Sequence, residues 1–308
     1  MASPVTWLVD VAAEPEWLGP LYERLRSLFA EVEARLSRFD EHSDLTQLNR
    51  QVGQWVSVDP MLYNALTVAS RAFRLTHGLF DPRVIGDLDR LGYQGAPVDM
   101  PPTGQNGGSW LEREPRERRL RINAPVDLGG IGKSLAVSWG ARLINQFLKE
   151  IEASSPPMLL NAGGDLQMLG SAVPDPDGWM IGVEHPQEPD QYALALNFGK
   201  PAAVCTSSIR IRRWKHDGTW VHHLIDPREH KPGGTGLASV TVSHARPTWA
   251  EVWSKALFLQ GAESIAAYAA HHRLTAWWLY ADGTWDATPS GMDHVAWIGP
   301  QLKRRMSS

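Results

Sequence analysis

The sequence predicts an α+β fold in which mixed or antiparallel β-sheets are flanked by helices. Strand-like segments outnumber helical ones, and several follow one another directly, whereas a doubly wound sheet would alternate strands with helices. At 308 residues, with 43% hydrophobic and 21% charged side chains, the chain suits one large domain with a sizeable core. We therefore expect a single domain over residues 1–308, with a possible smaller subdomain formed by residues 100–125 and neighbouring loops.

The first half of the chain predicts mainly helices. Apolar residues recur at the spacing of an amphipathic helix in the segments that begin at Trp17 and Met61. A glycine ends the second of these helices and an Asp-Pro pair begins a turn. The predicted elements are a strand at 5–11, helices at 17–36, 44–49 and 61–76, a turn at 78–82, a loop at 95–115, a strand at 118–122 and a helix at 134–149.

The second half predicts mainly strands, followed by two helices and a final strand. Short apolar runs are separated there by Gly, Asn and Pro. Many of the 14 tryptophans lie in this half, and their irregular spacing favours core positions. The predicted elements are a strand–turn–strand unit at 157–169, strands at 180–184, 193–198, 202–206, 220–225 and 240–243, helices at 249–260 and 262–272, and a final strand at 276–280.

Composition argues against several classes of protein. A net charge of −4 gives no basis for binding nucleic acid. The lone Cys205 cannot form an intrachain disulfide or a multi-cysteine metal site, and its apolar neighbours predict a buried strand. No run approaches the ~18 apolar residues of a membrane helix, and a secretory signal is not recognisable. We therefore expect a cytoplasmic protein without membrane insertion.

A glycine-rich turn joins the strand at 118–122 to the helix at 134–149. Three glycines in Asp127-Leu-Gly-Gly-Ile-Gly-Lys133 let backbone amides approach an anion at a helix N-terminus, and Lys133 lies on the first helical turn. The segment is a poor P-loop, because Asp127 stands where the first glycine should be. It predicts a phosphate-containing ligand, although an ordinary strand–helix turn explains the pattern about as well.

A second glycine turn follows at Asn161-Ala-Gly-Gly-Asp165. Its backbone amides could bind a ligand, and its carboxylate could bind a ribose or a ring nitrogen. Taken alone, the segment is better explained as an ordinary β-turn.

Two adjacent histidines precede Leu224-Ile-Asp-Pro227 in the predicted strand at 220–225. Because side chains alternate along a strand, one of His222 and His223 should face inward and the other outward. Adjacent histidines on a strand cannot chelate one ion together. An imidazole, whose pKa lies near neutrality, suits a general base close to phosphate-binding turns. A core histidine bonded to the backbone explains the pattern about as well.

Glu251 and Lys255 lie four residues apart on the predicted helix at 249–260 and therefore share a face. The spacing alone favours a surface salt bridge worth roughly 0.3–0.5 kcal/mol. The functional interpretation makes Glu251 an oxygen ligand for Mg²⁺, which binds carboxylates beside substrate phosphates. Lys255 would then add a second positive charge beside those phosphates.

The order of these motifs resembles the ApbE-type FAD:protein FMN transferases over roughly residues 6–299. Each motif is modest alone, and their common order carries the resemblance. The matching segments are Leu36-Ser-Arg-Phe39 with Ser43-Asp-Leu45 and Leu48-Asn49, Gly78-Leu-Phe-Asp-Pro82 with Leu91-Gly-Tyr93, Asp127–Lys133, Asn161–Asp165, Thr206-Ser207 and His223–Pro227.

Three places depart from the family pattern. Glu251 and Lys255 stand where the family has Asp and Thr on its metal-binding helix. Since a protonated lysine cannot ligate Mg²⁺, the metal site is altered. The segment Arg228-Glu-His-Lys-Pro232 replaces Arg-Thr-Gly-x-Pro, and Ser208 stands where glycine is usual.

The resemblance implies an α+β flavin-transferase-like sandwich and a transferase activity. Members cleave FAD, attach FMN to a Ser or Thr of an acceptor flavoprotein and release AMP with Mg²⁺ as helper. His223 is implied as the base and Lys255 as a second catalytic residue, with Gly130 and Glu251 at the metal. The implied FAD contacts are Ser37, Phe39, Tyr93, Asp127, Gly129, Gly130, Lys133, Asn161, Gly163, Gly164, Asp165, Ser207 and Leu224. The alternatives are an FAD-binding protein without transfer activity and an FAD pyrophosphatase that gives FMN and AMP.

Overall fold

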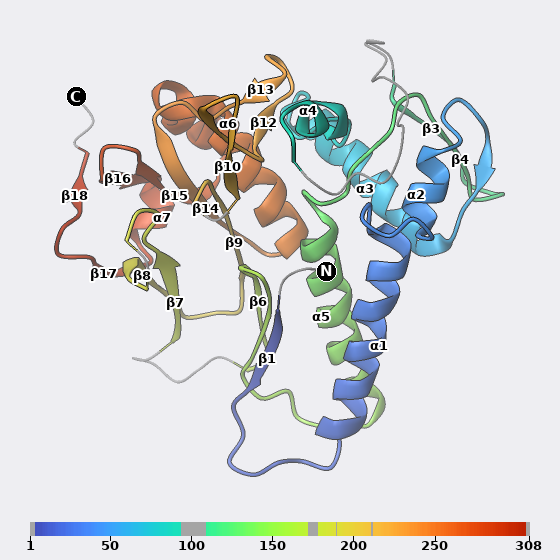
Figure 1. Cartoon of the computed structure of the whole chain (residues 1–308). Coiled ribbons are helices and arrows are strands. Elements are labelled where there is room, and N and C mark those ends of the chain that lie inside the picture. Colours follow the sequence, from blue (N-terminus) through green and yellow to red (C-terminus); the bar gives the residue numbers. More distant parts are fainter. Residues whose placement is uncertain (1–3, 94–108, 172–177, 189, 211, 306–308) are drawn as a thin grey trace.

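An eight-stranded sheet forms the centre of the computed structural model, which describes residues 4–93, 109–171, 178–188, 190–210 and 212–305 (Figure 1). Neighbouring strands are antiparallel except for the last pair, which is parallel. The predicted α+β class with mixed and antiparallel sheets is confirmed. In spatial order the strands are β1 (Val5–Val9), β5 (Met158–Ala162), β6 (Asp165–Leu169), β9 (Ala203–Ser208), β14 (Leu237–His244), β15 (Thr275–Tyr280), β16 (Thr284–Ala287) and β18 (Lys303–Arg304).

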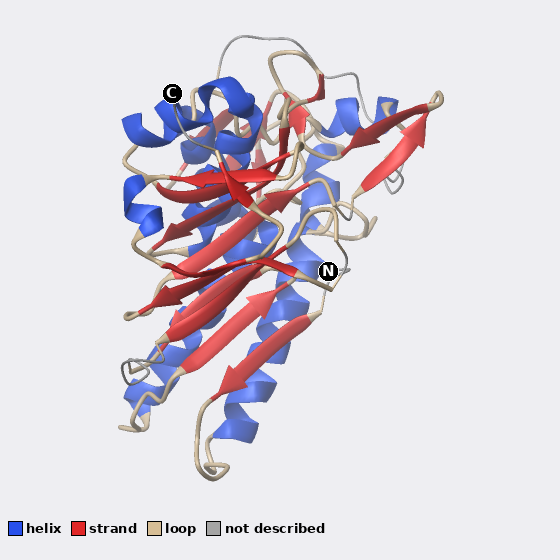
Figure 2. Ribbon diagram, turned by 90° about the vertical axis from the view of Figure 1, so that its left-hand side faces the viewer, coloured by secondary structure: helices blue, strands red, loops and turns tan. Residues whose placement is uncertain are grey.

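The long helices run behind the central strands in Figure 2, and α1 lies beside α5 in Figure 1. No helix in the described ranges is long and apolar enough to cross a membrane. The two helices predicted at 249–260 and 262–272 are confirmed as α6, which Gly261 divides with a φ of 73°. The helices are α1 (Leu18–Leu36), α2 (Asp44–Asn49), α3 (Pro60–Leu75), α4 (Ile85–Arg90), α5 (Gly132–Glu150), α6 (Pro247–His271) and α7 (Pro289–Met292).

Smaller sheets surround the central one. Residues 109–125 of the predicted subdomain supply two strands of one of these sheets, and its residues 100–108 lie outside the described part. The small sheets are β2 (Val56–Ser57), β4 (Arg119–Ile122) and β3 (Leu111–Glu114); β17 (Val295–Ile298), β8 (Tyr192–Phe198) and β7 (Trp179–Glu184); β10 (Arg213–His216) and β11 (Thr219–His222); and β12 (Ile225–Asp226) and β13 (Lys231–Pro232).

Different layers cover the two faces of the central sheet. On one face α6 packs against β9 and β14, and Trp278 lies in that core with Phe258. On the other face the sheet of β7, β8 and β17 covers the strands, and Trp277 packs there with Phe198. Trp277 and Trp278 are neighbours in β15, so their side chains point to opposite faces of the sheet and pack in different cores. A third core joins α1, α3 and α5 to β4 and β5.

Several predicted elements are wrong in extent. The predicted loop at 95–115 contains β3, whereas its residues 95–108 lie outside the described part. The predicted strand at 220–225 is two strands of different sheets, because the backbone leaves β11 at His223, where the peptide N–H donates to the Arg212 carbonyl. The strand at 276–280 is followed by β16, β17 and β18. These strands, like α4, are too short for a clear periodic signal.

The fold predicts different costs for alanine at two glycines with the same backbone conformation. Gly234, before β14, has a φ of 75°, and a Cβ there would lie 2.0 Å from the Phe258 ring. Gly218, in the β10–β11 turn, has a φ of 77° and no atom within 4 Å of that position. Gly218→Ala should cost about 1 kcal/mol of unfolding free energy through its positive φ, and Gly234→Ala should cost about 1–3 kcal/mol more through overpacking.

Urea unfolding of both variants measures this difference. Equal losses of stability would show that Phe258 moves aside without cost.

Candidate active site

A cavity of about 740 Å³ brings together residues that lie far apart in the sequence. Its walls come from the end of α1, the turn before α4, the start of α5, the β5–β6 turn, β9, the segment after β11, and α6. Fifteen of the residues that the resemblance implies line it: Phe39, Tyr93, Asp127, Gly129, Gly130, Lys133, Asn161, Gly163, Gly164, Asp165, Ser207, His223, Leu224, Glu251 and Lys255.

Ser37 is the implied contact that is not among the described lining residues. Its carbonyl oxygen accepts a hydrogen bond from Ser43 Oγ at 2.5 Å, and its hydroxyl accepts one from the Phe39 N–H at 3.2 Å. Ser43 also caps α2 by accepting a bond from the Thr46 amide. Ser37 therefore shapes the turn that presents Phe39 to the cavity.

The side chain of Asp127, the residue that makes the segment a poor P-loop, holds the first glycine turn. Asp127 Oδ1 accepts a hydrogen bond from the Gly129 amide at 2.7 Å, and the Asp127 N–H donates to the Pro82 carbonyl at 2.7 Å. Helix α5 then begins at Gly132 without a side-chain cap. Amides at an uncapped helix N-terminus favour an anion. The Asp127 carboxylate therefore supports the turn, and the Arg38 guanidinium beside it offsets its negative charge.

Arg38 lines the cavity, and although it lies in the matching segment Leu36–Phe39 it is not among the implied contacts. Its side chain is 2% exposed, and its Nε lies 3.5 Å from Asp127 Oδ2. The guanidinium carbon lies 4.7 Å from the centre of the Phe39 ring and 5.3 Å from that of Tyr93. Its Nη1 lies 3.6 Å from Asp89 Oδ1 in an ion pair that is longer than a hydrogen bond. An arginine in a polar segment carries no sequence signal that separates it from a solvated side chain.

The second glycine turn ends in a buried carboxylate. Gly163 and Gly164 have φ values of 61° and 97°, and the Asn161 side-chain oxygen accepts a bond from the Gly164 amide at 2.9 Å. Asp165 is 3% exposed, and one of its oxygens has no hydrogen-bond partner within the described ranges. Burial, and then the charge of Glu251, raises the pKa of Asp165 to about 7. This carboxyl group is therefore partly protonated at neutral pH.

Glu251 and Lys255 form an ion pair that faces the cavity. Their side chains are 6% and 16% exposed. The salt bridge predicted from their spacing is present, but the prediction that it lies on the surface is wrong. Ser254 Oγ donates to the other Glu251 oxygen at 3.3 Å and lies 2.8 Å from Ser207 Oγ on β9. A Cβ on Gly130 would lie 3.3 Å from Lys255 Cε, so the lysine stem passes close to the first glycine turn.

The two histidines have different surroundings. The His222 ring packs edge-on against Phe258, with ring centres 6.0 Å apart, whereas His223 lines the cavity. His223 Nδ1 lies 3.3 Å from the Arg212 carbonyl oxygen. Because a carbonyl can only accept, Nδ1 carries the proton and Nε2 carries the lone pair. Burial, then the charges of Arg212 and Lys255, lowers the pKa of His223 to about 3, so the ring is neutral at physiological pH.

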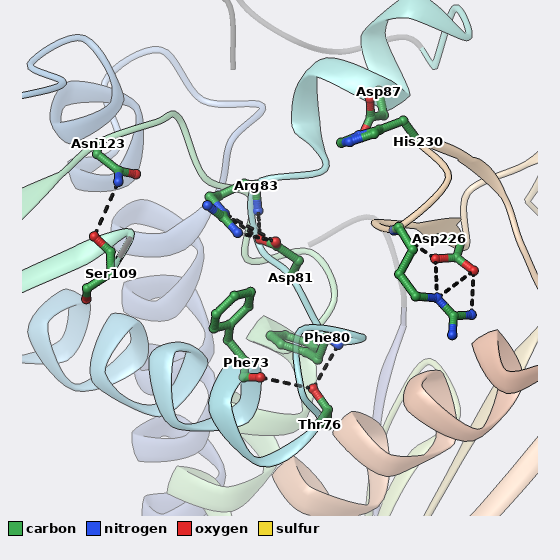
Figure 3. A network of polar contacts seen from close by, with 11 residues as sticks. Phe73, Thr76, Phe80, Asp81, Arg83, Asp87, Ser109, Asn123, Asp226 and His230 are labelled. Atoms are coloured by element: carbon green, nitrogen blue, oxygen red, sulfur yellow. Dashed lines mark hydrogen bonds and ion pairs between the residues drawn. The ribbon is translucent and has the colours of Figure 1, made fainter. Parts of the chain in front are cut away.

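Polar contacts connect the segments around α4 to the β12–β13 turn and fix Asp81, which lines the cavity (Figure 3). Asp81 accepts hydrogen bonds from Arg83 at 2.9 and 2.6 Å. His230 Nδ1 donates to Asp87 Oδ2 at 3.0 Å and so ties the β12–β13 turn to α4. Glu229 and His230, which depart from the family pattern, are not among the described lining residues, whereas Ser208 and Lys255 are.

Known proteins match this chain over most of its length. The sequence model of the ApbE family matches residues 3–278. The FAD:protein FMN transferase of Treponema pallidum is 28% identical over 80% of this chain and 72% of its own length. The enzyme of that name in Escherichia coli K12 is 24% identical over 92% of this chain and 81% of its own length.

Solved structures show the same fold. The ApbE protein of Thermotoga maritima has a TM-score of 0.78 at 22% identity, covering 94% of this chain and 99% of that one. The flavinyl transferase ApbE of Pseudomonas stutzeri has a TM-score of 0.74 at 19% identity, covering 95% and 97%. Since the sequence model of the family spans most of the chain and the fold agrees, the protein belongs to the ApbE family.

Proposed function

We propose that this protein transfers FMN from FAD to a Ser or Thr hydroxyl of a target flavoprotein and releases AMP. One observation carries the proposal. One cavity is lined by both glycine turns, by the neutral His223, and by Lys133 and Lys255. Relatives that match most of this chain are named FAD:protein FMN transferases. The acceptor protein and a cytoplasmic location stay predictions from the sequence.

The cavity offers separate places for the parts of FAD. The uncapped N-terminus of α5 and Lys133 suit the diphosphate. Phe39, 57% exposed, and Tyr93 present aromatic faces that suit the flavin ring. The remaining proposed contacts are Asp127, Gly129, Gly130, Asn161, Gly163, Gly164, Asp165, Ser207 and Leu224.

His223 suits the role of general base. Its Nε2 would take the proton of the acceptor hydroxyl while the oxygen bonds to the phosphorus of the FMN half. The bond from that phosphorus to the bridging oxygen breaks, and AMP leaves with the electron pair. Lys255 and Lys133 would stabilise the charge that develops on the diphosphate.

Mg²⁺ at Glu251 and the Gly130 carbonyl does not fit the residues as they stand. The Lys255 ammonium already binds one Glu251 oxygen, and its stem passes beside Gly130. A unit charge and a divalent ion about 4 Å apart repel by roughly 8 kcal/mol at an effective dielectric constant of about 20. We therefore propose that Lys255 supplies the positive charge that Mg²⁺ would otherwise supply, with Glu251 holding the lysine in place.

Incubation with FAD and Ser- or Thr-containing acceptor peptides tests the proposal by the FMN mass increment. His223→Ala should lower transfer about 10²–10⁴-fold while FAD still binds, because the hydroxyl loses its base. His222→Ala is the matched control and should keep the activity. Free FMN and AMP without a peptide adduct would identify a pyrophosphatase. FAD binding without AMP release would identify a binding protein.

Protonation of His223 should not lower kcat/KM for FAD as the pH falls from 8 to 5. Because the pKa of His223 is lowered to about 3, the base form persists as pH falls from 8 to 5. Asp165 titrates near pH 7, so kcat/KM for FAD is best measured in an Asp165→Asn background. We expect a level profile from pH 8 to 5 in that variant. A limb near the ordinary imidazole pKa of about 6.5 would contradict the described surroundings of His223.

Lys255→Thr should convert a metal-independent enzyme into a Mg²⁺-dependent one. The wild type should keep its rate in EDTA. The variant should lose about 10²–10³-fold without metal and recover partly with Mg²⁺, because threonine offers an oxygen ligand where the ammonium was. Lys255→Met leaves Glu251 equally unpaired but offers no ligand, so Mg²⁺ should not rescue it. If Mg²⁺ changes the rate of Lys255→Thr no more than that of the wild type, the ion pair has a purely structural role.

A further inference from the structure

The β10–β11 hairpin carries a basic and aromatic face. Lys215 lies opposite Trp220 in the hairpin register, and Arg213 lies two residues away on the same face. The Arg213 guanidinium lies 5.2 Å and the Lys215 ammonium 5.6 Å from the centre of the Trp220 ring. Trp220 is 61% exposed, which contradicts the core position expected for the tryptophans of this half.

The cations of this face form no ion pair in the described part of the chain, and Asp217 Oδ2 of the hairpin turn lies 3.5 Å from His216 Nε2 instead. Neither Arg213 nor Lys215 has a salt bridge within the described ranges, whereas Arg210 just before the hairpin pairs with Glu184. The segment Arg210–His216 reads Arg-Ile-Arg-Arg-Trp-Lys-His in a chain whose net charge is −4. The face is therefore locally opposite in sign to the chain as a whole, and its field attracts an acidic partner.

The hairpin is attached firmly to the candidate site. On its other face Trp214 Nε1 donates to the Leu91 carbonyl at 2.6 Å, and the Trp214 ring lies 5.0 Å from that of Tyr93. β11 leads directly into His223, and Arg212, just before β10, lines the cavity and provides the carbonyl for His223 Nδ1. The exposed face is thus held at a set position relative to His223.

We propose that the face formed by Arg213, Lys215 and Trp220 docks the acceptor protein, and that the acceptor segment around its Ser or Thr is acidic. This inference rests on the proposed function, since a hydroxyl that reaches His223 must arrive on a segment that enters the cavity, and the hairpin adjoins the cavity wall at Arg212 and His223. Carboxylates of that segment pair with Arg213 and Lys215, and Trp220 offers an amphipathic surface for its side chains.

Two labelled peptides of equal length with a central Thr test the inference, one flanked by Asp and Glu and the other by Lys. Fluorescence anisotropy with the FAD-loaded protein measures binding, and mass spectrometry measures FMN transfer. The wild type should bind the acidic peptide about tenfold more tightly, and added salt should weaken this preference. Arg213→Glu with Lys215→Glu should remove or reverse the preference while FAD affinity stays unchanged.

Lys200→Glu with Lys303→Glu is the matched control, because both lysines are exposed, neither lines the cavity, and the net charge changes equally. The control should keep the preference. Arg213→Gln with Lys215→Gln removes the cations without reversing charge and should abolish it if the hairpin is intact. Equal effects of the control and hairpin variants, or tighter binding of a single-stranded oligonucleotide than of the acidic peptide, would overturn the inference.

The outcomes also separate this inference from the proposed function. Transfer to both peptides without a charge preference would refute the docking face and leave the transferase standing. A preference that depends on the hairpin but without any transfer would refute the transferase and leave an acidic-ligand surface.

Discussion

Packing of α6 against β9 and β14 is the constraint on which the rest of the structure depends. The first half of α6 is mostly buried, and Glu251 and Lys255 on it line the cavity. Buried charges must be paired, and the lysine therefore binds the glutamate beside the first glycine turn. Ser254 and Ser207 extend this polar contact to β9. A helix placed for its apolar contacts thus also positions the charges of the site.

The charges of the cavity balance one another before any ligand binds. Glu251 is paired with Lys255, and Asp165, with a pKa near 7, avoids a second full negative charge beside it. Burial, together with Arg212 and the same lysine, keeps His223 neutral. A diphosphate entering this cavity meets positive charge from Lys133 and Lys255 and a free imidazole lone pair. These features suit the proposed transfer from FAD to a hydroxyl.

Much of the architecture could be predicted because it rests on local patterns. Apolar periodicity placed the long helices, and Gly261 divides α6 where the two predicted helices meet. Both glycine turns and the pair of histidines could be named because backbone freedom and imidazole chemistry are properties of the residues themselves, whereas the choice of His223 came from the family resemblance. Short strands such as β16 and β18 were missed, since two to four residues carry no reliable period. Arg38 and the exposed Trp220 were missed because their importance lies in neighbours distant in sequence.

The sequence by itself determined the α+β class, the family resemblance and the set of residues with binding chemistry. Only the tertiary structure decided how those residues act on one another. Asp127 is engaged by the Gly129 amide and lies beside Arg38, so it supports the turn. Lys255 is a buried partner of Glu251, so the pair faces the cavity and does not lie on the outer surface. The physical reason is that pairing, desolvation and pKa depend on distances between side chains, which sequence spacing sets only within a single helix or strand.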